Sequence, residues 1–331
     1  MNNYLPEGYL ISSAENRELT SSIRGLEKAR DQEKILEATA VMCDSDLNIT
    51  VDLCGIKGII PKSEALLAEE NQKDIAIITR IGKPVCFKVT DFTRDAEGKT
   101  VVMLSRKSAQ AECRENFIMK LTAGDVIDAK VTHMEKFGAF VDIGCGLISL
   151  MTIDSISVSR ISHPKDRFTV GMNLKAVVKS IDYETGRVYV SQKELLGTWL
   201  ENASEFSVGQ TVAGTIRSVE DYGVFIELSP NLTGLAEARD DLTVGQSAAV
   251  YIKNIIPDRM KIKLVIIDAA KKDSALKSPK YYYPSGNHIS HWRYSPPGCG
   301  KVIESIFSGD EKAGTQDTNR ICFKLRFIMC R

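Results

Sequence analysis

The most constraining feature of this 331-residue sequence is a pattern that occurs twice. In the first copy Gly124 precedes an aromatic-Gly-x-Phe group that begins at Phe137, and in the second copy Gly209 precedes the same group at Tyr222. The interval from glycine to aromatic residue is 13 positions in both copies. Each copy continues with a Val-Gly pair and a run rich in β-branched residues. Such self-similarity predicts that one small structural unit is used repeatedly along the chain.

A third, more divergent copy lies upstream. Residues 49–60 correspond to the region that follows the aromatic group in the other copies, and residues 101–107 correspond to 188–193. The stretch 44–50, where the aromatic-Gly-x-Phe group would fall, holds no aromatic residue. The first copy therefore keeps the pattern of the scaffold and lacks the aromatic pair.

Each copy contains about five short β-rich runs, punctuated by glycine, over roughly 60–75 residues. This size and strand number are typical of the OB-fold, a five-stranded Greek-key barrel. We therefore expect a mainly β chain of three tandem OB-fold modules joined by short helices. An N-terminal helix and an irregular C-terminal tail complete the predicted architecture.

Periodicity and composition predict where these units begin and end. Apolar side chains at helical spacing predict helices over residues 14–38, 105–121 and 193–206. The predicted divisions of the chain are 1–31 for an N-terminal helical segment, 32–108 for the divergent first module, 122–196 for the second module, 207–268 for the third module and 269–331 for a basic, aromatic-rich tail.

Alternation along residues 139–143 indicates which side chains of the second module face solvent. It puts three apolar side chains on one face of a strand, and Phe140 with Asp142 on the other. An aromatic residue on the polar face predicts that Phe137 and Phe140 form a solvent-facing ring pair. The alternative is that both rings pack in the core beneath the inter-strand loop.

The charge balance restricts how such modules could bind a polyanion. The sequence has 43 basic and 43 acidic side chains, whereas a protein that neutralises phosphate through bulk charge is normally strongly basic. Residues 122–196 hold nine of each sign, and 207–268 hold six basic and eight acidic. Residues 269–331 hold eleven basic and five acidic. A nucleic-acid role of the barrels would therefore depend on local surfaces, with positive charge concentrated in the tail.

The eight cysteines include no C-x-x-C pair, so neither a disulfide framework nor a zinc ribbon is predicted. The first ten residues lack the apolar run of a secretory signal, and no stretch approaches about 18 consecutive apolar residues. These features predict a cytoplasmic protein that does not associate with membranes.

The second copy carries a characteristic set of glycine, aromatic and charged residues along its whole length. They are Gly124, Phe137, Gly138, Phe140, Asp142, Val170, Gly171, Asp182, Gly186, Arg187 and Ser191. This pattern resembles the S-one (S1) RNA-binding domain. The arrangement of several copies is similar to the bacterial small-subunit ribosomal protein S-one family, and the resemblance covers roughly residues 35–268.

The resemblance also implies an RNA-binding surface. In this family that surface consists of the two aromatic residues, a histidine on the next strand, and an aspartate and an arginine near the end. The implied RNA-binding residues of the second module are Phe137, Phe140, Thr152, Asp182 and Arg187, where Thr152 stands in place of the histidine. An ion pair of Arg187 with Asp182 or Glu184 is the alternative role of that arginine.

The other modules match this set less completely. In the third module the implied RNA-binding residues are Tyr222, Phe225 and Lys261, but Glu237 takes the histidine position and Pro257 the aspartate position. The first module keeps only Lys99 at the basic position and has Pro61 where the histidine would be.

The tail combines basic and aromatic residues. Lysines and arginines alternate with tyrosines and Trp292 between residues 271 and 297, a composition that suits contact with a single strand or docking. The alternative is a strap folded over the third barrel, with the aromatic side chains buried. His288, His291 and Cys299 are of metal-binding types, but their spacing gives little support for a site. Residues 321–330 alternate like a half-buried strand.

These observations favour a non-catalytic protein of the translation machinery that binds single-stranded RNA, with mRNA and the small ribosomal subunit as partners. The sequence shows no catalytic constellation and no phosphate-cradling glycine loop, so no cofactor, metal or small-molecule substrate is predicted. The alternatives are barrels that target an RNA-processing activity, and a protein-interaction or RNA-tethering factor in transcription or ribosome assembly.

Overall fold

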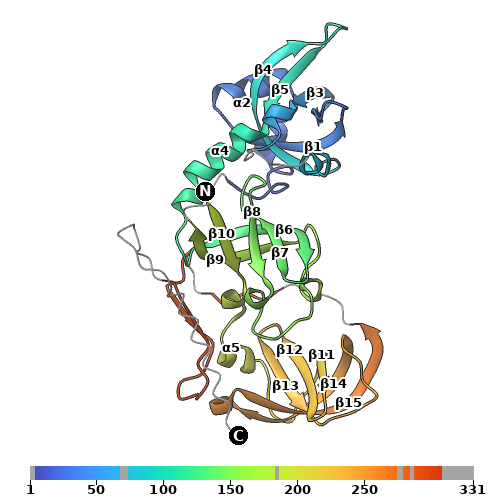
Figure 1. The fold of residues 1–331 in the computed structure, drawn as a ribbon, viewed down its shortest axis with the longest axis vertical. Coiled ribbons are helices and arrows are strands. Elements are labelled where there is room, and N and C mark those ends of the chain that lie inside the picture. Colours follow the sequence, from blue (N-terminus) through green and yellow to red (C-terminus); the bar gives the residue numbers. More distant parts are fainter. Residues whose placement is uncertain (1–3, 68–73, 183–185, 274–278, 284–286, 308–331) are drawn as a thin grey trace.

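The computed structural model describes residues 4–67, 74–182, 186–273, 279–283 and 287–307. The strands β1 to β15 form three closed five-stranded barrels that follow one another along the long axis of the molecule (Figure 1). In each barrel the first strand pairs with the second and the fourth, and the third pairs with the fifth in parallel. The predicted fold class, a mainly β chain of tandem OB-like barrels, is confirmed.

The strands of each barrel are short and separated by tight turns. Barrel one consists of β1 (Leu36–Cys43), β2 (Ile49–Leu53), β3 (Ile56–Ile60), β4 (Pro84–Arg94) and β5 (Thr100–Ser105). Barrel two consists of β6 (Val126–Glu135), β7 (Gly138–Asp142), β8 (Ile148–Thr152), β9 (Asn173–Asp182) and β10 (Arg187–Ser191). Barrel three consists of β11 (Thr211–Glu220), β12 (Gly223–Ser229), β13 (Leu232–Ala236), β14 (Gln246–Ile256) and β15 (Lys261–Asp273).

Short helices precede, connect and interrupt the barrels. The α-helices are α1 (Ala14–Thr20), α2 (Ile23–Asp31), α3 (Ile75–Ile78), α4 (Arg106–Asn116) and α5 (Trp199–Ala203). Single 3-10 turns are η1 (Lys62–Glu64), η2 (Ile118–Lys120), η3 (Ile153–Ser155), η4 (Pro164–Asp166), η5 (Lys193–Leu196) and η6 (Pro257–Arg259). None of the helices in the described ranges has the length and apolar character needed to cross a membrane.

The helix predicted over residues 14–38 is wrong at its C-terminal end. The helical segment stops at Asp31, where Glu33 adopts a left-handed conformation with φ of 51° and Lys34 N donates to the Ala29 carbonyl. Such a residue ends a helix because the following chain must leave the helical axis. From Leu36 the apolar side chains point into barrel one, so burial in the barrel decides the structure there.

The described part of the tail forms the strap that the sequence left as an alternative. It runs beside barrels two and three and includes the hairpin of β16 (His291–Arg293) and β17 (Glu304–Ile306) (Figure 1). Trp292 and Tyr294 are buried, in a hydrophobic cluster that contains the core of barrel three and also Leu195 and Trp199. The tail also bonds to barrel two, where Ile289 N donates to the Gly124 carbonyl at 2.8 Å. The strand predicted over 321–330 lies outside the described residues.

A buried ionic cluster joins barrel one to barrel two. Arg106 at the start of α4 is fully buried, and its Nε and Nη2 atoms donate to the Glu7 carboxylate at 2.7 and 3.1 Å. Arg80 adds a contact to Glu7 at 3.3 Å. The Glu7 backbone N–H donates to Asp142 on β7 at 2.7 Å, so the same residue binds both barrels.

The charges within this cluster shift one another's ionisation. Burial alone would raise the pKa of Glu7, but Arg106 and Arg80 hold that pKa below its ordinary value. Asp142 lies on the other side of Glu7, and burial together with the negative charge of Glu7 raises the pKa of Asp142. The sequence placed Asp142 on the polar face of its strand. It is nevertheless buried, because the N-terminal segment covers it.

Replacement of Arg106 by alanine should destabilise the chain strongly. The change leaves the Glu7 carboxylate buried with less compensation, a loss that typically costs about 3–5 kcal/mol. The matched control is Arg239→Ala, which breaks the exposed pair of Arg239 with Asp241 and should lower the free energy of unfolding far less, because water screens exposed ion pairs. Denaturant unfolding measures both values, and equal effects would contradict a structural role of the cluster.

Glu37, near the same junction, predicts a pH dependence of stability. Its Oε2 accepts from the N–H groups of Gly8, Leu10 and Ile11, whereas its buried Oε1 has no partner among the described residues. Burial raises the pKa of Glu37 from 4.5 to about 7. The folded state therefore holds this proton more firmly than the unfolded chain does. Stability present below about pH 4.5 is lost as the pH rises through about 7, by up to about 3 kcal/mol.

Glu37→Gln should accordingly flatten the dependence of the melting temperature on pH between about 4.5 and 8. The control is Glu97→Gln, which removes an exposed carboxylate paired with Lys99. Calorimetry across this pH range measures the slope. A Glu37→Gln protein whose slope equals that of the unmodified chain would refute the assignment.

Candidate nucleic-acid interface

The β6–β7 hairpin of barrel two presents a pair of aromatic rings at its turn. Phe137 is 55% exposed, which rules out the core alternative for this ring. Phe140 lies between the buried Ala139 and Val141 and faces outward. The two ring centroids are 5.9 Å apart at an interplanar angle of 88°, the edge-to-face arrangement that aromatic pairs prefer.

Barrel three repeats this arrangement at the same place. Tyr222 is 70% exposed at the turn between β11 and β12, and Phe225 faces outward from β12. Their centroids are 6.0 Å apart at 84°. The two modules therefore share the ring pair in geometry as well as in sequence.

Steric crowding explains why a glycine stands between the two aromatic residues in each barrel. A Cβ atom built on Gly138 would lie 2.4 Å from the carbonyl oxygen of Met151 on β8, and one on Gly223 would lie 2.5 Å from the carbonyl oxygen of Ala236 on β13. Backbone leaves no room at either position, so only glycine lets the next strand approach the ring-bearing hairpin.

Barrel two has a third ring, His133, which was not among the predicted site residues. Phe137, Phe140 and His133 together form the ring platform of barrel two. His133 is the cross-strand partner of Phe140, and their ring centroids are 5.9 Å apart at 26°. The Nε2 atom of His133 also contacts Glu135 at 2.7 Å. The equivalent partner of Phe225 in barrel three is Ser218. Pairing across a β-bulge brings these residues together, and a search for sequence motifs does not register it.

Thr152, which takes the expected histidine position, lies close to the ring pair. It is opposite Gly138 in the ladder, and its hydroxyl lies 3.0 Å from that of Ser155. Lys179 Nζ donates to the same Ser155 hydroxyl at 2.9 Å. Two lysines, Lys179 and Lys193, contact Asp154 at this edge of the platform. Burial alone would raise the pKa of Asp154, but the Thr152 hydroxyl and these lysines hold that pKa below its ordinary value.

Asp182 and Arg187 lie on the same outer face, toward the other end of the strands. They are cross-strand partners at the turn end of the β9–β10 hairpin, and Arg187 is exposed. Glu184, the other partner considered for Arg187, lies outside the described residues. The structure thus places all five predicted residues of barrel two on one face, with the rings at one end and the Asp182–Arg187 pair at the other.

The predicted residues of barrels one and three are placed less favourably. Lys261 is exposed at the start of β15. The residue of β15 that lies in line with Phe225 is Lys263 instead, because Phe225 pairs with Leu235 and Leu235 pairs with Lys263. In barrel one Lys99 is exposed and paired with Glu97 at 2.8 Å. The position of Phe140 is held in barrel one by Thr50, which pairs with Met42.

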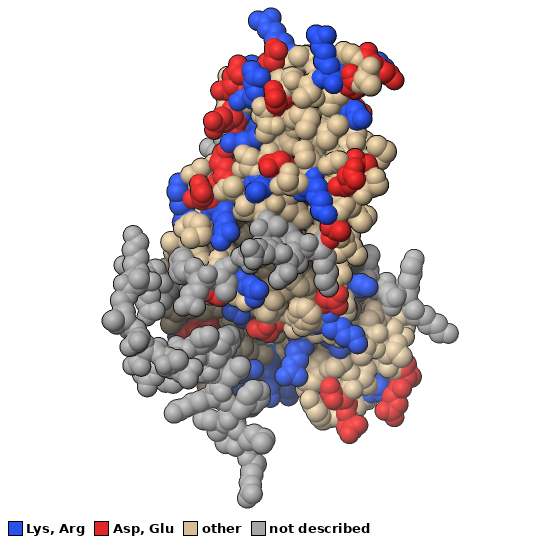
Figure 2. Space-filling model, turned by 45° about the horizontal axis from the view of Figure 1, so that its top comes forward, with Lys and Arg blue, Asp and Glu red and all other residues tan. Residues whose placement is uncertain are grey.

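Figure 2 shows basic and acidic side chains mixed over the face of the molecule that it presents, in line with a sequence that has 43 residues of each sign. His288 and His291 of the tail face separate carboxylates, Asp125 at 2.8 Å and Glu304 at 3.2 Å. Across the described residues, no group of three metal-binding side chains gathers.

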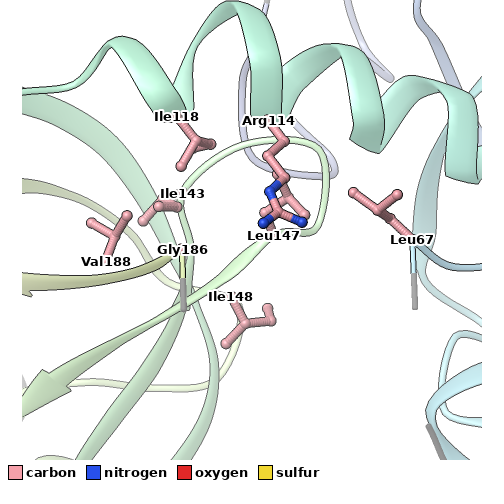
Figure 3. A pocket seen from close by; sticks show the side chains of 8 residues that line it. All are labelled: Leu67, Arg114, Ile118, Ile143, Leu147, Ile148, Gly186 and Val188. Carbon is pink, nitrogen blue, oxygen red and sulfur yellow. The ribbon is translucent and has the colours of Figure 1, made fainter. Parts of the chain in front are cut away.

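One cavity of about 130 Å³ lies elsewhere on barrel two. Ile118, Ile143, Leu147 and Val188 line it, and Arg114 is its only charged residue (Figure 3). Its lining residue Ile143 directly follows the end of β7, whereas the rings lie near the start of β7. The cavity is therefore separate from the ring platform.

Comparison with known proteins agrees with this geometry. Residues 120–193 match the S1 RNA binding domain, a match that covers barrel two. The predicted resemblance of this module to the S1 domain is therefore confirmed, in a chain whose described residues form three tandem OB-like barrels.

Similarity to individual proteins extends over more of the chain than the domain match does. The chain is similar to small ribosomal subunit protein bS1 of Staphylococcus aureus (strain COL), with 28% identity over 82% of this chain and 71% of the relative. The bS1 protein of Staphylococcus epidermidis is 27% identical over the same shares. A solved multidomain protein with nucleic acid binding domains from Streptococcus pneumoniae is 13% identical. The match covers 71% of this chain and 73% of that protein, with a TM-score of 0.24.

Gly138→Ala should lower the free energy of unfolding by about 1–3 kcal/mol, because the added methyl group meets the Met151 carbonyl and forces β7 from β8. Gly300→Ala is the control, since its Cβ would meet nothing within 4 Å and its effect should be within about 0.5 kcal/mol. Urea unfolding provides the comparison. Two variants of equal stability would contradict the steric account of the motif.

Proposed function

We propose that this chain is a non-catalytic protein that binds single-stranded RNA and holds mRNA in the translation machinery, next to the small ribosomal subunit. The observation that carries the proposal is the exposed edge-to-face ring pair, present at the same turn in barrels two and three. The match to the S1 RNA binding domain and the similarity to bS1 proteins support it.

Base stacking supplies most of the binding energy in this proposal. A base on an aromatic side chain contributes about 1–3 kcal/mol, and every base has a π-face, so stacking tolerates many sequences. Phe137, Phe140 and His133 give barrel two the larger platform, with Tyr222 and Phe225 as a second one. Single strands are favoured because bases in a duplex are already stacked.

Phosphate contacts play a smaller part. Arg187 and Asp182 at one end of the platform, and Thr152 with Lys179 at the other, offer partners for the backbone or for base edges. Lys261 has this role in barrel three. Because the barrels have few cations and no net positive charge, we expect micromolar affinity that falls with rising salt, with a shallower slope than that of a basic protein.

The residues of barrel one favour a second function, contact with a protein. Its row equivalent to the rings consists of Met42, Thr50, Ile59 and Met103, which offers no aromatic ring. Met42 and its neighbour Val41 are each 51% exposed. Flexible apolar side chains suit contact with a protein better than contact with bases, so barrel one is the candidate for a protein-interaction or tethering role.

The paired change Phe137→Ala with Phe140→Ala should weaken binding of a uridine-rich single strand more than tenfold, because two stacking surfaces are lost. The matched control is Tyr251→Ala, which removes an exposed ring elsewhere on barrel three. Fluorescence anisotropy measures affinity, and thermal unfolding checks that the barrel remains folded. Unchanged affinity in a folded double variant would overturn the stacking mechanism.

Crosslinking to RNA in cells, followed by sequencing, separates the proposed roles. Many mRNAs support the function in translation, a single structured RNA supports a role in processing or assembly, and no RNA supports the protein-interaction role.

A further inference from the structure

The ladder pairing of barrel two aligns an outward row of residues across four strands. His133 on β6 pairs with Phe140 on β7, and Phe140 pairs with Leu150 on β8. Leu150 in turn pairs with Tyr189 on β10. The row therefore begins and ends with an aromatic ring, and Tyr189 was not among the predicted site residues.

Tyr189 is oriented like Phe140. It is half-buried between the buried Val188 and Val190, so its side chain points away from the core, as that of Phe140 does. Arg187 lies two positions earlier on the same strand and hence on the same face. The cross-strand partner of Tyr189 on β9 is Ser180, which is small and exposed and leaves space beside the tyrosine ring.

This ring is particular to barrel two. The residue at the equivalent place, in parallel register with the third strand, is Lys263 in barrel three and Met103 in barrel one. The three barrels share a backbone frame but carry a ring, a cation and a thioether at this position. The identity of this residue therefore distinguishes the modules.

We propose that Tyr189 is a second base-stacking position of barrel two, so that RNA crosses the strands from His133 and Phe140 toward Tyr189 and Arg187. This inference rests on the proposed function and names the course of the RNA. Neighbouring strands are about 4.8 Å apart, so Tyr189 lies roughly 10 Å from Phe140 along the row, with Leu150 between them. That span exceeds one base step of about 3.4 Å, so the two positions take different bases.

Tyr189→Ala in the full chain should weaken binding of a ten-nucleotide oligouridine at least about fivefold, the loss expected for one stacked base. Tyr189→Phe keeps the ring and should bind within twofold of the unmodified chain. Tyr251→Ala again controls for the loss of an exposed tyrosine, and Tyr189→Leu provides a second ringless variant in case the alanine variant does not fold.

Photocrosslinking of the unmodified chain to 5-iodouridine oligomers gives a readout that does not depend on a variant. Mass spectrometry should find RNA attached to Tyr189 in addition to the Phe137–Phe140 hairpin. Binding that is lost in the double phenylalanine variant but unchanged in both ringless Tyr189 variants, without a crosslink at Tyr189, would overturn this inference and leave the proposed function standing. Binding unaffected by any of these changes would overturn both.

Discussion

The arrangement of the barrels depends on buried carboxylates that project from the second strand of a barrel. Asp142 on β7 accepts the backbone N–H of Glu7, and Glu227, at the same place on β12, accepts from Arg217 and Arg167. Both lie two residues after the outward phenylalanine of the ring pair. A buried carboxylate without a partner is costly, so each holds a neighbouring element in place. In barrel one the equivalent Asp52 is exposed and accepts from Gly55 N within its own turn.

One strand therefore serves two purposes in barrels two and three. Its first outward residue carries a ring to solvent, and its next outward residue is covered by chain that precedes the barrel. Asn231, fully buried, reinforces the second junction by accepting from Val158 N and donating to the carbonyl of Gly197. Because rings and anchors share one short strand, the platform has a fixed orientation relative to the preceding barrel.

The sequence predicts the parts of this molecule that depend on local pattern. The repeat and its glycines predict three barrels, and alternation around Phe140 predicts the outward ring. His133, Tyr189 and Lys263 were missed because strand register and a β-bulge decide which residues meet across a barrel. The burial of Asp142 was missed because the covering segment is more than a hundred residues away in the chain. Local periodicity also extended the first helical pattern too far, since burial of the apolar residues of β1 overrides it.

The course of the tail has a consequence for how the chain folds. Asp125, at the start of barrel two, pairs with His288, 163 positions further along the chain, and Trp292 belongs to the hydrophobic cluster that contains the core of barrel three. Such distant contacts must wait for loop closure and slow folding. During synthesis barrel one is able to close on local contacts alone, whereas barrels two and three acquire their last partners only after the tail has emerged. The order of synthesis thus leaves the ring-bearing barrels as the last part of the described chain to reach their final stability.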